Sequence, residues 1–211
     1  PCERGRPMTA TSPTLVLFDL DGVLVEYDRP RRLQHLGDAV GRTADHVHEA
    51  LFGSGLEDRY DAGLLSTDAY LDELGRNLDC NVDRETWSAA RLASMTCAAE
   101  TCTRVARLAQ RVEIGVLTNN GVLVESLLPV ALPGLFPLLE GRVFCSGLLR
   151  ASKPSQEIFH IALDRLGHTP HHALFLDDNF DNVEGARAAG LFAEHVAHPG
   201  AFDTILACYG L

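Results

Sequence analysis

The chain has 211 residues, of which 46% are hydrophobic and 22% are charged, and its formal net charge is −11. This composition predicts a folded protein with one domain, or with a core and a smaller insert, and excludes a disordered chain. The excess of acidic residues argues against nucleic acid or an anionic membrane as a partner, and no apolar run approaches the roughly 18 residues that span a bilayer.

The first stretch, residues 1–13, contains three prolines and no apolar periodicity, so we expect a flexible leader there. Met8 is a candidate natural start, and the sequence leaves open whether residues 1–7 are native. The short apolar run after the leader is interrupted by Asp19 and does not form a signal peptide. Since the six cysteines show no CxxC spacing, we expect reduced thiols and a cytoplasmic location.

A continuous apolar run at residues 14–18 predicts a strand that is buried on both faces, as in a parallel sheet. Four similar runs follow at residues 113–117, 142–145, 173–176 and 191–196. Helical patterns separate the later runs, at residues 158–166 before Gly167 and at residues 183–189 before Gly190. This alternation predicts an α/β fold with a parallel sheet.

Residues 25–99 differ, because they show no convincing strand and several helical patterns. We expect helices at residues 31–40, 44–52, 67–77 and 84–94. A helical block after the first strand indicates a subdomain inserted into the sheet core, which would comprise residues 14–24 and 100–211. Trp87 is expected to pack inside the insert. Four residues of the insert are candidates for substrate specificity because they lie near a possible cavity mouth: Arg29, Arg32, Arg59 and Tyr60. For each of them, a solvent-exposed position without such a role is nevertheless favoured.

Polar side chains follow the predicted strands at their carboxyl ends, where parallel sheets bind ligands. They are Asp19 and Asp21 after the first strand, Thr118 and Asn119 after the second, Lys153 beyond the third, and Asp177 and Asp178 after the fourth. Carboxylates that converge repel one another and require a cation, and a ligand set made only of oxygen atoms suits Mg²⁺. We therefore predict a metal site at this edge of the sheet.

This set of side chains predicts phosphoryl transfer, in which charge stabilisation and alignment dominate. Asp19 can attack phosphorus and form an aspartyl-phosphate. Asp21 can protonate the leaving alcohol and then activate the water that hydrolyses the intermediate. Thr118 and Asn119 can donate hydrogen bonds to phosphate oxygens, and Lys153 can neutralise a further negative charge.

Each motif also has a simpler interpretation when it is taken alone. Residues 19–22 could begin a calcium loop, but Val23 stands where an oxygen ligand is required and no helix precedes the motif. Residues 118–121 and 177–182 are also good turn and helix-capping sequences, and Lys153 alone would be a surface lysine. The functional hypothesis therefore depends on the whole set.

Four segments, in order, resemble the motifs of the haloacid dehalogenase-like superfamily: residues 18–24 (Phe-Asp-Leu-Asp-Gly-Val-Leu), 117–119 (Leu-Thr-Asn), 153–154 (Lys-Pro) and 176–190. The chain is similar to the phosphatase branch over about residues 14–200, which implies a Rossmann-like parallel sheet core with an inserted α-helical cap. The resemblance also implies site roles. Asp19 would be the nucleophile and Asp21 the acid/base residue. Magnesium would be bound by the Asp19 carboxylate, the Asp21 carbonyl and Asp178, with Asp177 acting through water. The phosphoryl group would be held by Thr118, Asn119 and Lys153.

The insert resembles the helical cap that screens substrates in this family, which implies a small-molecule phosphate ester as substrate. Residues 177–186 resemble glucose-1-phosphate phosphatases and the N-terminal phosphatase domain of soluble epoxide hydrolases, and residues 57–63 resemble the former loosely. These likenesses favour a sugar phosphate. Asn182 stands where many relatives have an aspartate, so we expect only a supporting role for it.

We thus expect a Mg²⁺-dependent phosphomonoester hydrolase that acts on a small phosphorylated metabolite, as a monomer or homodimer. A phosphomutase of the same fold is an alternative that no single residue excludes. A non-catalytic protein that binds a phosphate ligand is a weaker alternative, since every side chain that catalysis requires is present. A dehalogenase is disfavoured, because it needs no metal and lacks an acid at the position of Asp21. The sequence does not identify the leaving alcohol, the oligomeric state or the pathway.

Overall fold

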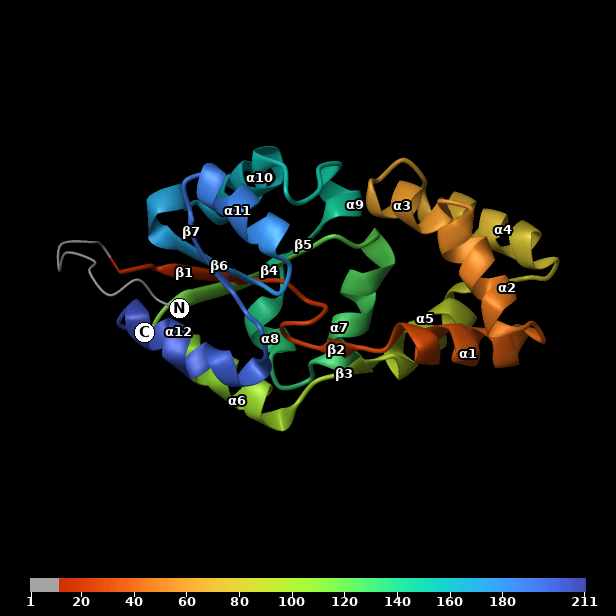
Figure 1. The fold of residues 1–211 in the computed structure, drawn as a ribbon, viewed down its shortest axis with the longest axis horizontal. Coiled ribbons are helices and arrows are strands. Elements are labelled where there is room, and N and C mark those ends of the chain that lie inside the picture. Colours follow the sequence, from red (N-terminus) through yellow and green to blue (C-terminus); the bar gives the residue numbers. More distant parts are fainter. Residues whose placement is uncertain (1–11) are drawn as a thin grey trace.

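The computed structural model describes residues 12–211 and contains a central sheet of five parallel strands in the order β5-β4-β1-β6-β7 (Figure 1). The strands are β1 (Leu15–Phe18), β4 (Glu113–Thr118), β5 (Val143–Cys145), β6 (Ala173–Asp177) and β7 (Phe192–His195). Each lies at a predicted position, so the predicted α/β fold with a parallel sheet is confirmed. Because all five strands run the same way, their carboxyl ends meet at one edge of the sheet.

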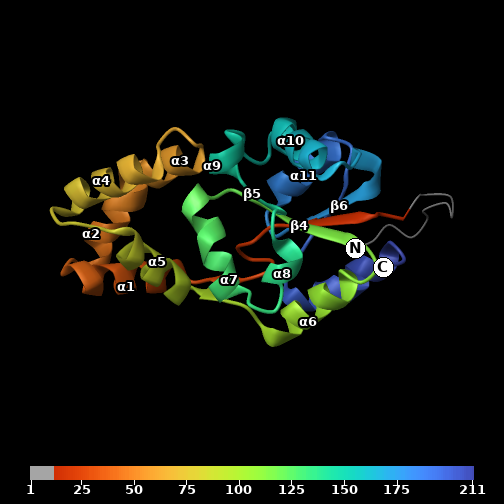
Figure 2. The same ribbon diagram turned by 180° about the vertical axis from the view of Figure 1, so that it is seen from behind.

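Helices cover both faces of the sheet, which explains the uninterrupted apolar strand β1. Val16 and Phe18 point into one core cluster, and Leu15 and Leu17 into another, because side chains alternate across a strand. Helices α10 (Gln156–Leu166) and α11 (Phe180–Ala188) cover one face, while α6 (Ala99–Leu108) and α12 (Phe202–Cys208) cover the other (Figures 1 and 2).

Shorter elements complete the sheet core. They are the 3₁₀ turns η2 (Val122–Leu127), η3 (Pro170–His172) and η4 (Pro199–Ala201), and the one-turn helices α7 (Leu128–Ala131), α8 (Phe136–Leu139) and α9 (Ser146–Leu149). Their three- to six-residue lengths are too short for a helical period to show in the sequence. Among residues 12–211, no helix is both long and apolar enough to cross a membrane.

Residues 29–93 form a helical lobe that lies beyond one end of the sheet (Figures 1 and 2). It comprises α1 (Arg29–Val40), α2 (Ala44–His48), the π-helical turn η1 (Glu49–Gly53), α3 (Leu56–Asp61), α4 (Thr67–Leu78) and α5 (Arg84–Ala93). Five of these segments match the four predicted helices, since α2 and η1 together occupy the helix expected at residues 44–52, and α3 was not predicted. Side chains that cap helix N-termini set the boundaries, as when Ser66 accepts a hydrogen bond from the amide of Ala69 at 3.2 Å.

Two short strands, β2 (Glu26–Tyr27) and β3 (Met95–Thr96), pair antiparallel and join the helical lobe to the sheet core. The prediction that residues 25–99 contain no strand is therefore wrong. A two-residue strand shows no alternation that a sequence pattern could reveal. The lobe also touches the core through Tyr60 of α3, whose hydroxyl accepts a hydrogen bond from the amide of Leu123 at 3.2 Å.

Aromatic rings fill the interior of the helical lobe. Tyr60 stacks on Tyr70 with ring centroids 4.1 Å apart, and Trp87 donates a hydrogen bond to the Tyr70 hydroxyl at 2.9 Å. The prediction that Trp87 packs internally is confirmed. The prediction of solvent-exposed positions is wrong for Tyr60 and Arg32. Both residues are buried, because their polar groups find hydrogen-bond partners inside the lobe.

The structure pairs Cys97 with Cys102 in a disulfide, so the prediction of reduced thiols is wrong for these two. Cys97 precedes α6 and Cys102 lies inside it, a five-residue separation that carries no recognised disulfide signature. Cys80, Cys145 and Cys208 are free, as expected. Cys2 and most of the predicted leader, residues 1–11, lie outside the described residues.

Candidate active site

A cavity of about 360 Å³ opens between the carboxyl edge of the sheet and the helical lobe. Its sheet side is lined by six of the seven predicted site residues, namely Asp19, Asp21, Thr118, Asn119, Lys153 and Asp178. The seventh, Asp177, lies directly behind them, fully buried and in contact with Lys153. The structure therefore brings all seven residues together, although they span more than 150 positions of the sequence.

Asp19 extends from the end of β1 and is almost fully buried. Its Oδ1 atom accepts a hydrogen bond from the amide of Leu20 at 2.7 Å and lies 2.8 Å from the Nζ atom of Lys153. Burial raises the pKa of Asp19 to about 7, although the charge of Lys153 opposes that rise. A further cation at this position would favour the ionised carboxylate.

Lys153 is the buried cation at the centre of the acidic groups. Its Nζ atom lies 2.7 Å from Asp177 Oδ2 as well as 2.8 Å from Asp19 Oδ1, so it bridges two strand ends. Its backbone is held by Asn119, which donates to the Lys153 carbonyl at 2.9 Å and accepts from the Lys153 amide at 2.9 Å. The side chain of Asn119 thus positions the lysine loop, whereas the sequence suggested that it donates to phosphate.

Asp177 is the buried anchor of the loop after β6. Its carboxylate accepts hydrogen bonds from the amide of Asn179 at 2.7 Å and from the side chain of Asn182 at 3.1 Å and 3.2 Å. These bonds orient the carboxylate toward Lys153 and start helix α11. Asn182 therefore supports Asp177, in line with the minor role expected for it.

The carboxylates of Asp19, Asp177 and Asp178 could together hold a metal ion, because ligand atoms from all three lie within 4.8 Å of one another. Burial, and then the charge of Asp177, raises the pKa of Asp178. Three carboxylates around one lysine leave unbalanced negative charge, which a divalent cation would relieve. Their hard oxygen donors fit Mg²⁺.

Gly22 is required where the chain turns beneath Asp178. Its φ of +85° lies in the left-handed region, and an added Cβ atom would lie 2.1 Å from Asp178 Oδ2. Any side chain would therefore displace the carboxylate as well as strain the backbone. This close approach gives the glycine of the first motif a defined structural role.

Asp21 faces the helical lobe, unlike the other carboxylates. Its Oδ2 atom accepts hydrogen bonds from Arg91 of α5 at 2.6 Å and from Asn120 at 3.0 Å, and Asn120 also donates to Thr118 Oγ1 at 2.8 Å. The other oxygen, Oδ1, is buried and has no hydrogen-bond partner among the described residues. Asp21 is therefore held by one oxygen and free at the other.

Sequence reasoning missed Arg91 and Asn120 as site residues. Asn120 directly follows the second motif, and its position beyond a strand end could have identified it. Arg91 lies inside a helix of the lobe and reaches Asp21 from 70 positions away. Its burial among the site residues depends on tertiary packing and leaves no local signal.

The lobe side of the cavity carries three arginines, in contrast to the carboxylates of the sheet side. It is lined by Arg29, Arg32, Phe52, Glu57, Asp61 and Arg91. Arg59, another specificity candidate, instead forms an ion pair with Glu73 and does not line the cavity. Of the four candidates, the structure places Arg29 and Arg32 at the cavity.

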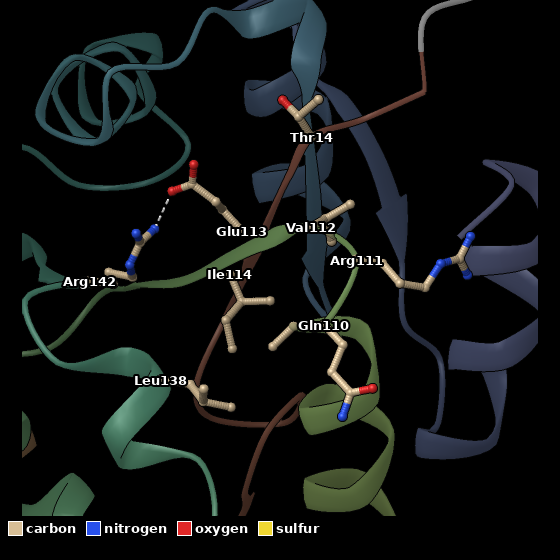
Figure 3. Close-up of a pocket in the computed structure, with 9 residues that line it drawn as sticks. Thr14, Gln110, Arg111, Val112, Glu113, Ile114, Leu138 and Arg142 are labelled. Carbon is tan, nitrogen blue, oxygen red and sulfur yellow. Dashed lines mark hydrogen bonds and ion pairs between the residues drawn. The ribbon is translucent and has the colours of Figure 1, made fainter.

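A second cavity, of about 490 Å³, lies at the amino ends of β1 and β4 (Figure 3). Its charged groups satisfy one another or the backbone: Arg142 pairs with Glu113, and Arg111 donates to the carbonyl of Gly210 at 2.8 Å. Parallel sheets bind ligands at the other edge. The cavity at the carboxyl ends is therefore the candidate active site.

Comparison with known proteins identifies the family. Residues 13–190 match the sequence profile of a hydrolase family, the haloacid dehalogenase-like hydrolases. The chain is 30% identical over 203 residues to Phosphatase MT3486 of Mycobacterium tuberculosis (strain CDC 1551 / Oshkosh), an alignment that covers 90% of this chain and 89% of the relative.

Two solved structures share the fold. A predicted HAD-like family hydrolase from Porphyromonas gingivalis is similar with a TM-score of 0.78 and 24% identity, over 93% of this chain and 98% of that one. The HAD family enzyme bt-2542 from Bacteroides thetaiotaomicron, in complex with magnesium and inorganic phosphate, is similar with a TM-score of 0.73 and 19% identity, over 87% of this chain and 93% of that one.

Proposed function

This chain belongs to the haloacid dehalogenase-like hydrolase family, and on that premise we propose that it is a Mg²⁺-dependent phosphomonoester hydrolase acting on a small phosphorylated metabolite. The family expected from the four motifs is confirmed, and so is the expectation of an enzyme. The observation that carries the proposal is the cluster of Asp19, Asp177 and Asp178 around the buried Lys153. A relative named as a phosphatase and a structural neighbour that holds magnesium and phosphate support it.

Asp19 is the nucleophile in this proposal. Both of its hydrogen-bonded contacts fall on Oδ1, which leaves Oδ2 to attack phosphorus and form an aspartyl-phosphate. Asp19, the Asp21 carbonyl and Asp178 would hold the magnesium ion, with Asp177 acting through water because both of its oxygens already accept hydrogen bonds. When bound, the ion supplies positive charge to the carboxylates and to the phosphoryl oxygens. Lys153 fixes the direction of the nucleophile and adds a second positive charge beside it.

Asp21 is the acid/base residue. Arg91 and Asn120 hold Oδ2, so the partnerless Oδ1 carries the proton to the leaving oxygen and later accepts one from water. Thr118 is fixed beside it by Asn120, and its hydroxyl can donate to the phosphoryl group. The lobe thus enters the chemistry through Arg91, which donates to Asp21 and, at 3.3 Å, to the side-chain oxygen of Asn120.

We assign residues 25–99 as a cap that screens substrates and residues 14–24 with 100–211 as the phosphatase core. The two-stranded β2–β3 pair is the connection about which the cap would open. The cavity of about 360 Å³ between the two parts has the size of a small-molecule site and suits a ligand such as a sugar phosphate.

A panel of phosphate esters tests this function directly. Release of inorganic phosphate is measured with Mg²⁺ and, separately, with a chelator. The proposal predicts Mg²⁺-dependent release from at least one small ester and none with the chelator. Conversion of glucose 1-phosphate into glucose 6-phosphate without free phosphate would instead identify a phosphomutase. No turnover on any ester would favour a protein that only binds phosphate ligands.

A further inference from the structure

The helical lobe lines the cavity with three arginines, Arg29, Arg32 and Arg91, in a chain whose net charge is −11. Arg32 is 3% exposed and Arg91 is 1% exposed. Both touch Tyr27: Arg32 Nη1 donates to its hydroxyl at 3.3 Å, and the guanidinium carbon of Arg91 lies 4.2 Å from the ring centroid. The two buried guanidinium groups therefore lie around one aromatic side chain of the cavity wall.

Each buried arginine uses one terminal nitrogen within the protein and leaves the other without a partner. Arg32 Nη1 binds Glu57 at 2.6 Å, and Arg91 Nη2 binds Asp21 at 2.6 Å. Arg32 Nη2 and Arg91 Nη1 are also buried, but neither has a hydrogen-bond partner in residues 12–211. Because a buried donor without an acceptor is unfavourable, these two atoms indicate an acceptor that comes from outside the chain.

The acidic residues of the lobe cancel this positive charge only in part, since among residues 12–211 Glu57 is ion-paired with Arg32 alone. Both carboxylate oxygens of Glu57 are already bound, one by Arg32 and the other by the Tyr70 hydroxyl at 2.6 Å. Burial, reinforced by the charge of Glu57, raises the pKa of Asp61 to about 8, so this carboxyl group is mainly neutral at pH 7. The lobe therefore offers positive charge to a ligand whose phosphate faces the sheet.

We propose that the alcohol half of the substrate carries a second oxyanion, a carboxylate or a phosphate, which Arg32 and Arg91 bind through their partnerless nitrogens. This inference rests on the proposed phosphatase function and names its substrate class. Since Arg91 also holds Asp21, which serves the leaving oxygen, the second oxyanion lies only a few bonds from the ester. Paired guanidinium donors suit such a group because their hydrogen bonds to anions are charge-assisted.

Three short esters test the wild-type protein. 2-Phosphoglycolate carries a carboxylate, ethane-1,2-diol bisphosphate carries a second phosphate, and 2-hydroxyethyl phosphate has an uncharged alcohol half. With Mg²⁺ present, we expect kcat/KM for one or both anionic esters to exceed that for the uncharged ester by about tenfold or more. The better of the two identifies the oxyanion. Equal kcat/KM values for all three esters would overturn the inference.

Variants of Arg32 locate the selectivity. Arg32→Gln removes the charge, and Arg32→Lys keeps a cation beside Glu57 but loses the forked donors. We expect both variants to reduce the ratio of kcat/KM between anionic and uncharged esters to near one. Arg59→Gln is the matched control, because Arg59 lies in the lobe but pairs with Glu73 away from the cavity, and it should keep the wild-type ratio. An unchanged ratio in folded Arg32→Lys protein would contradict the assignment.

Binding of phosphonates separates this inference from the proposed function. 3-Phosphonopropionate and 3-hydroxypropylphosphonate cannot be hydrolysed and differ in the terminal carboxylate. Calorimetry with Mg²⁺ should show tighter binding of the carboxylated compound by about tenfold. If no ester is turned over but this preference holds, the phosphatase proposal fails and the oxyanion site stands. If esters are hydrolysed but the two phosphonates bind equally, the phosphatase proposal stands and a carboxylate site is excluded. The ratio of kcat/KM between ethane-1,2-diol bisphosphate and 2-hydroxyethyl phosphate then decides the inference.

Discussion

The sheet edge and the helical lobe face each other across one cavity and differ in charge and in construction. The sheet edge presents carboxylates around Lys153, each fixed by the end of a strand. The lobe presents guanidinium groups on helices, of which Arg32 and Arg91 are buried. Our proposals place the reaction at the sheet edge and the choice of substrate in the lobe, with Arg91 as a contact between the two.

The largest expected effect comes from the sheet edge. Asp19→Asn removes the proposed nucleophile while keeping its shape, so we expect kcat to fall by about 10³-fold or more with the fold intact. Phosphate release under saturating Mg²⁺ measures the effect. Asp181→Asn is the control, because Asp181 is an exposed acid in the first turn of α11, and it should retain wild-type kcat. Normal turnover by Asp19→Asn would assign the chemistry to another group.

Gly22→Ala tests the sheet edge by geometry rather than charge. The new Cβ atom would lie 2.1 Å from Asp178 Oδ2 and displace this proposed magnesium ligand. We expect activity to fall by about 10²-fold and the Mg²⁺ concentration for half-maximal activity to rise. Gly41→Ala is matched in backbone strain, with φ +67°, but has open space around it. It should lower the free energy of unfolding by about 1 kcal/mol and leave the Mg²⁺ requirement unchanged.

Arg91→Gln tests the link between the two regions. The variant loses the charged contact that holds Asp21 Oδ2, so the acid/base carboxyl is less well oriented. We expect a drop in kcat of about tenfold, with a shift of the pH–rate profile that a purely structural role would not produce. Arg84→Gln on the same helix is the control, since Arg84 is exposed and pairs with Asp68 at the surface. Equal pH–rate profiles for the two variants would show that the lobe does not act through Asp21.

The smallest effect concerns stability in the lobe. Burial raises the pKa of Asp61 from 3.8 to about 8, so the folded state binds this proton more tightly than the unfolded state. The resulting stabilisation is full below pH 3.8 and is lost progressively as pH rises toward 8. Asp61→Asn should therefore flatten the fall in Tm between pH 5 and pH 8. Each kcal/mol of lost stability corresponds to about 2–4 °C in Tm for a chain of this size. Parallel Tm curves for the variant and the wild-type protein would contradict the raised pKa.

The two regions also differ in how far the sequence predicts them. Asp19 and Lys153 could be placed because apolar runs mark the strands and parallel strands align their carboxyl ends. Arg91 could not, since its contact with Asp21 joins positions 70 residues apart and depends on how α5 packs. Arg32 and Tyr60 were expected at the surface, because periodicity cannot show that a polar side chain has a buried partner. Side chains positioned by strand ends can therefore be placed from sequence, whereas side chains positioned by helix packing cannot.

The most direct test of the central claim is to trap the phosphorylated enzyme. Asp21→Asn removes the base that would activate water, so the intermediate should accumulate when Mg²⁺ and p-nitrophenyl phosphate, whose leaving group needs no protonation, are added and the reaction is quenched in acid. Peptide mass spectrometry should then find one phosphoryl group on Asp19 and none in a double variant that also carries Asp19→Asn. A phosphoryl group on another residue, or phosphate release at the wild-type rate by the double variant, would contradict the account.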